Sequence, residues 1–230
     1  MGLSSQTVLL AGASGLVGNR VLRRMLGEPG FAGRVIAPVR KALTASDPRL
    51  LAPVLDFSLG DEDFAQALDA VAPGSVDTYV CCLGTTLKAA GSRQAFIAVD
   101  RELVLRLSRI ARARGARQAI LVSSVGASRQ SANFYLRVKG EVEDALEQAG
   151  YERLDLMRPG LLLGPRADRR PLESALQRLA PLTNLALHGR FKPYRSVPAD
   201  GLARAMLALV GRPEPGVHVH GYAEIMRAAD

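Results

Sequence analysis

The sequence predicts an α/β fold in which one doubly wound parallel sheet carries helices on both faces. Short apolar or β-branched runs alternate with segments of helical periodicity along the chain. The first run leads directly into a glycine-rich turn and a helix. The fourth run, residues 77–83, is almost wholly apolar, as in a strand covered on both faces. We expect one domain over residues 1–230, with about 160–230 forming a cap and the last strand.

Seven strands are expected, because seven short runs rich in apolar or β-branched residues are separated by turns or helical segments. In chain order they are residues 7–11, 34–39, 54–57, 77–83, 118–123, 153–158 and 216–220. Helices are expected where apolar residues recur at helical spacing, as Leu103, Leu107 and Ile110 do. Gly115 and Gly150 follow two of these segments as C-caps. The expected helices are residues 16–26, 62–71, 96–114, 132–149, 172–179 and 199–210.

Composition and the N-terminal residues predict where the protein resides. The chain is 48% hydrophobic, which is typical of a globular protein. No apolar run approaches the roughly 18 residues that span a bilayer, so we expect no membrane association. The first residues lack the basic start and the cleavage site of a signal peptide. A cytoplasmic protein is therefore expected.

Neither the cysteines nor the histidines predict a redox or metal site. Cys81 and Cys82 are adjacent in an expected strand and point to opposite faces, so a disulfide between them would be strained. Both are expected to behave as small hydrophobic residues. His188, His218 and His220 have no cluster of carboxylates or thiols to complete a metal site, and we expect none.

A formal net charge of +8 raises nucleic-acid binding as an alternative function. The densest basic group fits the solvated face of an amphipathic helix. No aromatic residues lie among these arginines, as a base-stacking surface requires, so we expect no nucleic-acid partner. The group consists of Arg106, Arg109, Arg112, Arg114 and Arg117.

The turn after the first strand has the spacing of a phosphate-binding loop. It comprises Gly12-Ala13-Ser14-Gly15-Leu16-Val17-Gly18 and opens a helix. The first glycine permits a tight turn, the second a close approach of backbone N–H groups to a pyrophosphate, and the third close packing of helix and strand. The N-terminus of the helix adds further donors and a positive dipole end. The expected contacts to a dinucleotide are Gly12, Ser14, Gly15, Leu16 and Val17.

The end of the second strand indicates which dinucleotide binds. NAD-specific sites carry an acid there for the ribose hydroxyls, whereas this sequence has Arg40 and Lys41. Two cations favour a 2′-phosphate, and Arg40 can hold it with two hydrogen bonds. NADP(H) is therefore favoured over NAD(H). An ordinary pair of surface cations remains the alternative interpretation.

A serine, a tyrosine and a lysine suggest carbonyl chemistry. Tyr135 and Lys139 are four residues apart on an expected helix and so share one face. A phenol is a poor acid or base at neutral pH unless a cation stabilises its phenolate, which Lys139 can do. Ser124 follows the fifth strand and can hydrogen-bond the reacting oxygen, with Ser123 as the competing candidate. Ser123, Tyr135 and Lys139 are also expected to contact the cofactor.

These residues together resemble the short-chain dehydrogenase/reductase superfamily over about residues 5–225. The glycine spacing is similar to that of its atypical or extended branch. Arg158-Pro159-Gly160 and Gly164-Pro165-Arg166 resemble that branch's segment closing over the nicotinamide. Within the branch, residues 81–86 and the serine pair preceding Asn133-Phe134-Tyr135 look most like the Tat-interacting-protein type of oxidoreductase-like proteins. The resemblance implies an NAD(P)-binding Rossmann-type fold.

The resemblance also implies further contacts. Asp56 would meet the adenine, and Leu83, Gly84 and Thr85 would line the adenosine and nicotinamide ribose. Asp100 replaces the asparagine of the superfamily's catalytic tetrad, which puts the usual proton-relay water in doubt. The C-terminal region is shorter than in sugar-nucleotide epimerases, which argues against a large nucleotide sugar. Pro159, Gly160 and Leu162 would pack near the nicotinamide.

Two functions follow as hypotheses. The first is an NADP(H)-dependent oxidoreductase that acts on a small carbonyl or alcohol substrate through Ser124, Tyr135 and Lys139. The second is a non-catalytic NADP(H)-binding regulator with a protein partner, because a fold does not guarantee catalysis. The sequence predicts neither the substrate nor the oligomeric state.

Overall fold

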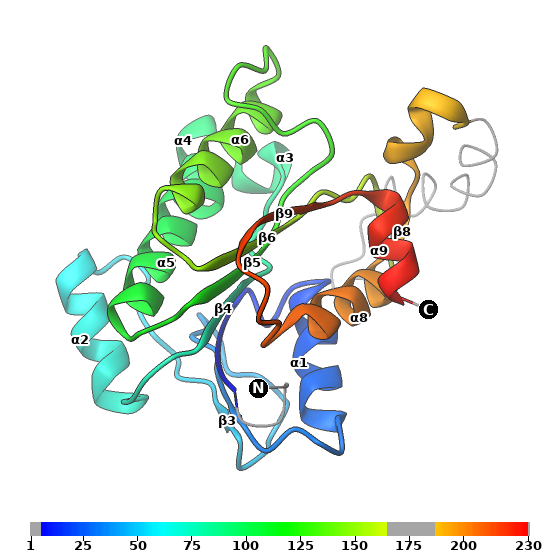
Figure 1. The fold of residues 1–230 in the computed structure, drawn as a ribbon. Helices are drawn as coiled ribbons and strands as arrows, with labels where there is room; N and C mark the ends of the chain where they lie inside the picture. The colour runs from blue at the N-terminus through cyan, green and yellow to red at the C-terminus, as the bar shows by residue number, and fades with distance from the viewer. Residues whose placement is uncertain (1–5, 165–186, 230) are drawn as a thin grey trace.

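The computed structural model describes residues 6–164 and 187–229, which form a seven-stranded, wholly parallel sheet flanked by helices (Figure 1). The strand order is β3-β2-β1-β4-β5-β6-β9, so the doubly wound sheet predicted from the sequence is confirmed. The sheet grows outward in both directions from the neighbouring strands β1 and β4. The strands are β1 Thr7–Ala11, β2 Arg34–Ile36, β3 Leu50–Leu51, β4 Thr78–Cys81, β5 Gln118–Val122, β6 Arg153–Met157 and β9 Gly216–His220.

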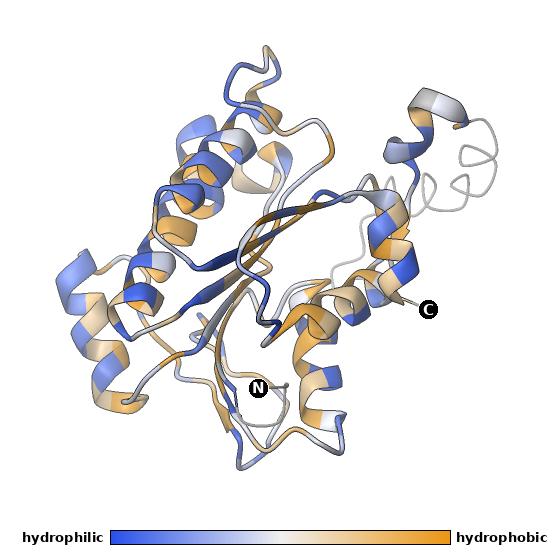
Figure 2. Cartoon of the chain, in the orientation of Figure 1, coloured by the Kyte–Doolittle hydropathy of each residue, from blue (hydrophilic) through white to orange (hydrophobic). Residues whose placement is uncertain are grey.

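Each face of the sheet packs its own hydrophobic core, because successive strand residues point to opposite sides. Val8 and Leu10 pack in the core that includes residues of α1 and α8, whereas Leu9 and Ala11 pack in the one that includes residues of α2 and α5. Hydrophilic residues gather on the outward faces of α5 and α6 (Figure 2). The helices are α1 Gly18–Gly27, α2 Asp61–Val71, α3 Leu87–Ala90, α4 Arg93–Ile97, α5 Leu103–Ala113, α6 Phe134–Glu147, α8 Ala199–Leu209 and α9 Tyr222–Ala229.

The third strand lies earlier in the chain than predicted. The expected strand at residues 54–57 is wrong, because β3 consists of Leu50 and Leu51. Val54 makes only an isolated bridge to Val39 and is 56% exposed. Pro53 has no N–H group to continue the ladder, so regular pairing ends before it.

The helix expected without interruption at residues 96–114 is divided by a wider turn. The chain passes from α4 into a π-helix, η2 (Ala98–Glu102), and then into α5. A π turn takes one more residue than an α turn and is frequent at functional sites. The hydrophobic period does not reveal such an insertion, and the four-residue α3 was missed because it is too short to show a period.

The chain after β6 forms smaller elements beside the sheet. A two-stranded parallel ladder joins β7 (Leu162–Leu163) to β8 (Val197–Pro198), and a 3₁₀-helix, η3 (Gly189–Tyr194), precedes β8. Helix α8 packs against α1, where Arg24 pairs with Asp200. Helix α9, which the sequence analysis did not predict, follows β9 and packs on α8. The helix expected at residues 172–179 lies outside the described residues.

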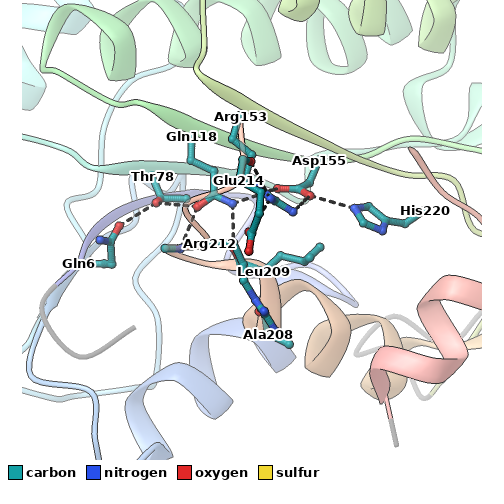
Figure 3. A network of polar contacts seen from close by, with 11 residues as sticks. Gln6, Thr78, Gln118, Arg153, Asp155, Ala208, Leu209, Arg212, Glu214 and His220 are labelled. Atoms are coloured by element: carbon teal, nitrogen blue, oxygen red, sulfur yellow. Dashed lines mark hydrogen bonds and ion pairs between the residues drawn. The ribbon is translucent and has the colours of Figure 1, made fainter. Parts of the chain in front are cut away.

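A buried polar network ties together the amino-terminal halves of β4, β5 and β6 (Figure 3). Asp155 is fully buried and accepts hydrogen bonds from Arg153 Nε at 2.7 Å and Gln118 Nε2 at 2.9 Å. Its other oxygen lies 2.8 Å from Arg153 Nη2 and 2.9 Å from His220 Nε2. Gln118 extends the network to Thr78 of β4. We interpret this network as structural, because none of its members lines the cavity at the carboxyl ends of β1, β4 and β5.

Candidate functional site

A cavity of about 1170 Å³ opens where the carboxyl ends of β1, β4 and β5 meet. Ligands bind at this place in doubly wound sheets, because the sheet changes direction between β1 and β4. Its lining comes from the glycine loop, α1, the segment after β4, the end of β5, α6 and the segment after β6. The predicted residues on it are Gly12, Ser14, Gly15, Leu16, Val17, Arg40, Leu83, Gly84, Thr85, Ser123, Ser124, Tyr135, Lys139, Pro159, Gly160 and Leu162.

The glycine loop is packed so closely that two of its positions exclude a side chain. Gly12 has φ +82°, and a Cβ added there would lie 2.9 Å from the carbonyl carbon of Cys82. A Cβ on Gly18 would lie 2.1 Å from the carbonyl oxygen of Gly12. The loop closes on itself through a 2.9 Å hydrogen bond from Gly15 N–H to Gly12 O. The first turn of α1 therefore begins directly behind the loop.

Replacing Gly18 with alanine is expected to weaken dinucleotide binding at least about tenfold and to cost roughly 1–3 kcal/mol of stability, because the new methyl group must push backbone apart. Fluorescence titration with NADPH and urea denaturation measure the two effects. Gly27→Ala is the matched control, since a Cβ at this other end of α1 meets nothing within 4 Å. Equal effects of the two substitutions would contradict this explanation.

The start of α1 is suited to an anion. Its N-cap, Val17, provides no side-chain hydrogen bond, and the first turn contains no acidic residue. Arg20 and Arg23 line the cavity instead. A cation is disfavoured at the positive end of a helix, so a nearby anionic ligand would relieve the repulsion. The sequence analysis missed both arginines, although Arg20 in an acid-free first turn was a usable signal.

The two cations after the second strand separate in the structure. Arg40 lines the cavity, whereas Lys41 is not among the described residues that do. Asp56 also lies off the lining. It accepts hydrogen bonds from the backbone N–H of Ser58 at 2.8 Å and from its hydroxyl at 2.7 Å, and these lower the pKa of Asp56.

Helix α6 presents Tyr135 and Lys139 to the cavity from its first two turns. Asn133 caps the helix by accepting a 3.2 Å hydrogen bond from Leu136 N–H. The Tyr135 ring packs against Phe96 with ring centroids 5.8 Å apart, and Lys139 Nζ lies 6.0 Å from the Tyr135 ring centroid. A Cβ on Gly140 would lie 2.2 Å from the carbonyl carbon of Ser128. This contact fixes α6 against the segment that follows β5.

Lys139 is buried and forms an ion pair with an equally buried carboxylate. Its Nζ lies 2.9 Å from Asp100 Oδ1, with side-chain exposures of 4% and 0%. The other carboxylate oxygen, Oδ2, accepts a 2.8 Å hydrogen bond from Thr85 N–H. Burial alone would lower the pKa of Lys139, but the charge of Asp100 raises it above its ordinary value. The lysine is therefore protonated at neutral pH.

Both candidate serines line the cavity. The Ser123 side chain is buried, and its Oγ has no hydrogen-bond partner among the described residues, whereas its N–H donates to Met157 O at 2.8 Å. The Ser124 hydroxyl is half-buried and donates a 3.3 Å hydrogen bond to Val125 O. Each hydroxyl is thus able to turn toward a ligand. Their relative roles stay predictions.

The segment after β6 is held by bonds to two other elements. Pro159 O accepts a 3.0 Å hydrogen bond from Val125 N–H, which joins this segment to the end of β5. Arg158 forms a two-pronged ion pair with the buried Glu143 of α6, at 3.0 Å and 2.5 Å. Gly160 packs on backbone, because a Cβ there would lie 2.4 Å from Arg195 O. Pro159, Gly160 and Leu162 are thereby placed on the cavity wall.

The far wall of the cavity consists mainly of small and apolar side chains that the sequence analysis did not predict. These residues lie on the segment after β4, on α3 and α4 and in the π turn, and they carry no distinctive chemical signal. Asp100 was predicted only as a departure from the tetrad. The missed residues of this wall are Cys82, Thr86, Ala89, Ala90, Ala95 and Val99, and elsewhere on the lining Asn19, Arg20, Arg23, Val122 and Leu161 were missed as well.

The basic group of α5 is engaged within the protein. Arg106 and Arg109 pair with Asp61, Arg114 with Asp69, and Arg117 with Glu152. Arg112 donates to the carbonyl oxygen of Ala116. Within residues 6–164 and 187–229, no group of histidine, cysteine, aspartate or glutamate could hold a metal ion. In the same ranges, no helix is long and apolar enough to cross a bilayer.

Solved structures share this fold. Aldohexose dehydrogenase from Thermoplasma acidophilum superimposes with a TM-score of 0.70 at 17% identity, covering 95% of this chain and 92% of that one. The Bordetella bronchiseptica enzyme WbmH, solved in complex with NAD+, gives a TM-score of 0.69 at 16% identity, covering 95% and 76%. At these identities the similarity establishes the Rossmann-type fold.

Similar sequences correct one prediction. Protein HTATIP2 of Rattus norvegicus is 37% identical over 174 residues, covering 74% of this chain and 69% of that protein. Protein fmp52 of Aspergillus fumigatus is 33% identical over 215 residues, covering 91% of each chain. The fmp52 proteins are named mitochondrial, which contradicts the expected cytoplasmic location. The lack of a recognisable signal peptide in the first residues did not justify that prediction.

The family itself is established by the extent of the match. The model of the NAD dependent epimerase/dehydratase family matches residues 8–222, which include the glycine loop, the serine pair, Tyr135 and Lys139. The identities with the two relatives above agree with this assignment. The chain belongs to the NAD dependent epimerase/dehydratase family.

Proposed function

We propose that this protein is an NADP(H)-dependent oxidoreductase that interconverts a small carbonyl compound and its alcohol. One observation carries the proposal: Ser124, Tyr135 and Lys139 line the same cavity as the glycine loop. The residues present suit a dinucleotide. The loop leaves no room for side chains at Gly12 and Gly18, and the start of α1 lacks a cap.

The phosphate-binding part of the cavity would use backbone and cations. N–H groups of the loop and of the first turn of α1 would bind the pyrophosphate. Arg40 would bind the 2′-phosphate, supported by its position on the lining. Lys139 would hydrogen-bond the nicotinamide ribose, and Pro159 and Leu162 would pack beside the nicotinamide. When bound, the cofactor supplies or accepts the hydride.

The protein's own residues would manage the charge that develops on the substrate oxygen. In the reducing direction, the Tyr135 hydroxyl donates its proton to that oxygen, and in the oxidising direction the phenolate takes the proton back. The Ser124 hydroxyl donates a hydrogen bond to the same oxygen. The tilted Phe96 ring and the buried Lys139 limit how far the phenol can move. The apolar wall near α3 and α4 would help to exclude water.

The direct test is an assay of NADPH oxidation with a panel of aldehydes and ketones, followed by NADP+ reduction with the matching alcohols. Turnover of any panel member at a rate above that without protein supports the proposal. A rival function is a non-catalytic NADP(H)-binding regulator with a protein partner. It predicts that NADPH binds and is never consumed across the panel, and that affinity for a partner protein changes with cofactor.

Charge reversal tests the proposed cofactor preference. Arg40→Glu is expected to weaken NADPH binding by about 10-fold to 100-fold, because a charge-assisted hydrogen bond to phosphate is lost, and to change NADH binding little. Fluorescence titrations with both cofactors measure this. Lys41→Glu is the control with the same charge change off the cavity lining. Equal affinity of the unaltered protein for NADPH and NADH would contradict the phosphate role of Arg40.

A further inference from the structure

Asp100 lies at the middle of the only π turn among the residues described, between α4 and α5. The wider turn directs this residue into the interior, where it is fully buried. It is absent from the cavity lining, and its carboxylate lies directly behind that wall. A buried charge needs a compensating charge and hydrogen bonds, so its partners reveal its role.

Both oxygens of Asp100 are directed at residues of the cavity wall. Oδ1 lies 2.9 Å from Lys139 Nζ, and Oδ2 accepts a hydrogen bond from Thr85 N–H at 2.8 Å. A Cβ on Gly84 would lie 3.7 Å from Asp100 Oδ1 and 3.8 Å from Lys139 Nζ. One carboxylate thus connects the lysine of α6 with the segment that follows β4.

The ion pair changes what Lys139 contributes to the site. The titratable groups that act on Lys139 are Asp100 from η2, Tyr135 from α6 and Cys81 from β4. Of these, Cys81 is a buried thiol whose pKa is raised by burial, so it is neutral. At neutral pH, Asp100 therefore supplies the negative charge that compensates the ammonium. A neutral pair exerts a weaker field on Tyr135 than an isolated lysine would.

We propose that Asp100 is a positioning residue that holds Lys139 Nζ and the segment 83–85 in register and, by neutralising the lysine, limits how strongly it stabilises the Tyr135 phenolate. The proposal rests on the proposed function of the cavity. In this proposal Asp100 neutralises Lys139, which a neutral side chain at the same position would not do. Lys139 then acts mainly as a fixed hydrogen-bond donor.

The test is the isosteric substitution Asp100→Asn, which removes the charge and keeps the shape. In the alcohol-oxidising direction, activity requires the phenolate and rises with pH. An unpaired Lys139 would stabilise that phenolate, so the midpoint of the rise is expected about one pH unit lower in the variant than in the unaltered protein. A midpoint that is unchanged or higher would overturn the proposal. A purely structural role would lower the rate without displacing the midpoint.

A second measurement requires no turnover and therefore separates this proposal from the proposed function. Phenolate formation is followed by ultraviolet absorbance in the unaltered protein and in Tyr135→Phe, and again in Asp100→Asn with and without Tyr135→Phe. Each difference isolates the signal of Tyr135. That signal is expected at lower pH in the Asp100→Asn background, even if no substrate is ever found. If turnover exists and the signal does not move, only the role of Asp100 fails.

Glu143→Gln provides the matched control. Glu143 is also a buried carboxylate of this region, and it lies on α6 one turn after Lys139, but it pairs with Arg158. Its substitution is expected to reduce stability but not to change the pH at which Tyr135 ionises. If Asp100→Asn does not fold, Asp100→Ser provides the same loss of charge with a smaller polar side chain. A shift in the control as large as that in Asp100→Asn would also overturn the proposal.

Discussion

Tyr135→Phe is expected to reduce turnover by about 10²-fold to 10⁴-fold, which is the usual contribution of a positioned general acid. The substitution removes one hydroxyl and retains the ring, so the packing against Phe96 persists. NADPH affinity should therefore change little. Steady-state kinetics on an active substrate, together with a cofactor titration, separate the chemical step from binding.

Tyr151→Phe is the appropriate comparison for this experiment. The Tyr151 hydroxyl bonds to Ser108 at 2.9 Å, and Tyr151 does not line the cavity. Its loss should lower stability slightly and leave kcat unaltered. Normal turnover by Tyr135→Phe would show that another group moves the proton, and the mechanism proposed above would have to be abandoned.

Asp155→Ala is expected to destabilise the fold by roughly 3–5 kcal/mol, because it leaves the buried Arg153 guanidinium with only the exposed Glu214 as a charged partner. Arg153 would lose both of its bonds to the carboxylate, and Gln118 would lose an acceptor. Urea denaturation measures the change. Glu152→Ala is the control, since the Arg117–Glu152 pair has the same two-pronged chemistry on the surface, where ion pairs contribute little. Similar losses of unfolding free energy in the two variants would contradict the idea that burial makes the Asp155 pairs more stabilising.

Acidification should remove the contribution of the Asp155 carboxylate to the stability of the unaltered protein. Burial alone would raise the pKa of Asp155, but hydrogen bonds from His220, Arg153 and Gln118 lower it below its ordinary value. A carboxylate with a depressed pKa stabilises the fold above its unfolded pKa, and this contribution is lost as the pH falls through the folded pKa. As the pH decreases below about 4, the unaltered protein is therefore expected to lose stability. This loss should be smaller in Asp155→Asn.

The sequence predicted strands well where side chains alone decide pairing. The bounds of β1 and β9 coincide with the predicted residues, and both segments are bounded by turn or polar residues. The third strand was misplaced, because Pro53 stops the ladder between two equally apolar runs. The π turn was missed because the apolar positions on either side still fit a helical period.

The site was predictable where backbone geometry requires a particular residue and less so elsewhere. Glycine spacing located the loop, since only glycine fits where a Cβ would meet backbone. Arg40 lies on the cavity lining and Lys41 does not, a difference that sequence alone does not determine for adjacent residues after β2. The alanines of α3 and α4 were not predictable, since a small apolar residue looks the same in a core and on a cavity wall.

The π turn that carries Asp100 has a consequence for how this region tolerates change. An α-helix rotates by about 100° per residue, so deletion of one residue from 98–102 would turn the preceding helix by that amount relative to α5. Phe96 would then leave the Tyr135 ring and Asp100 would leave Lys139, although every side chain was retained. Chain length in this short stretch is therefore under tighter constraint than the identity of its outward-facing residues.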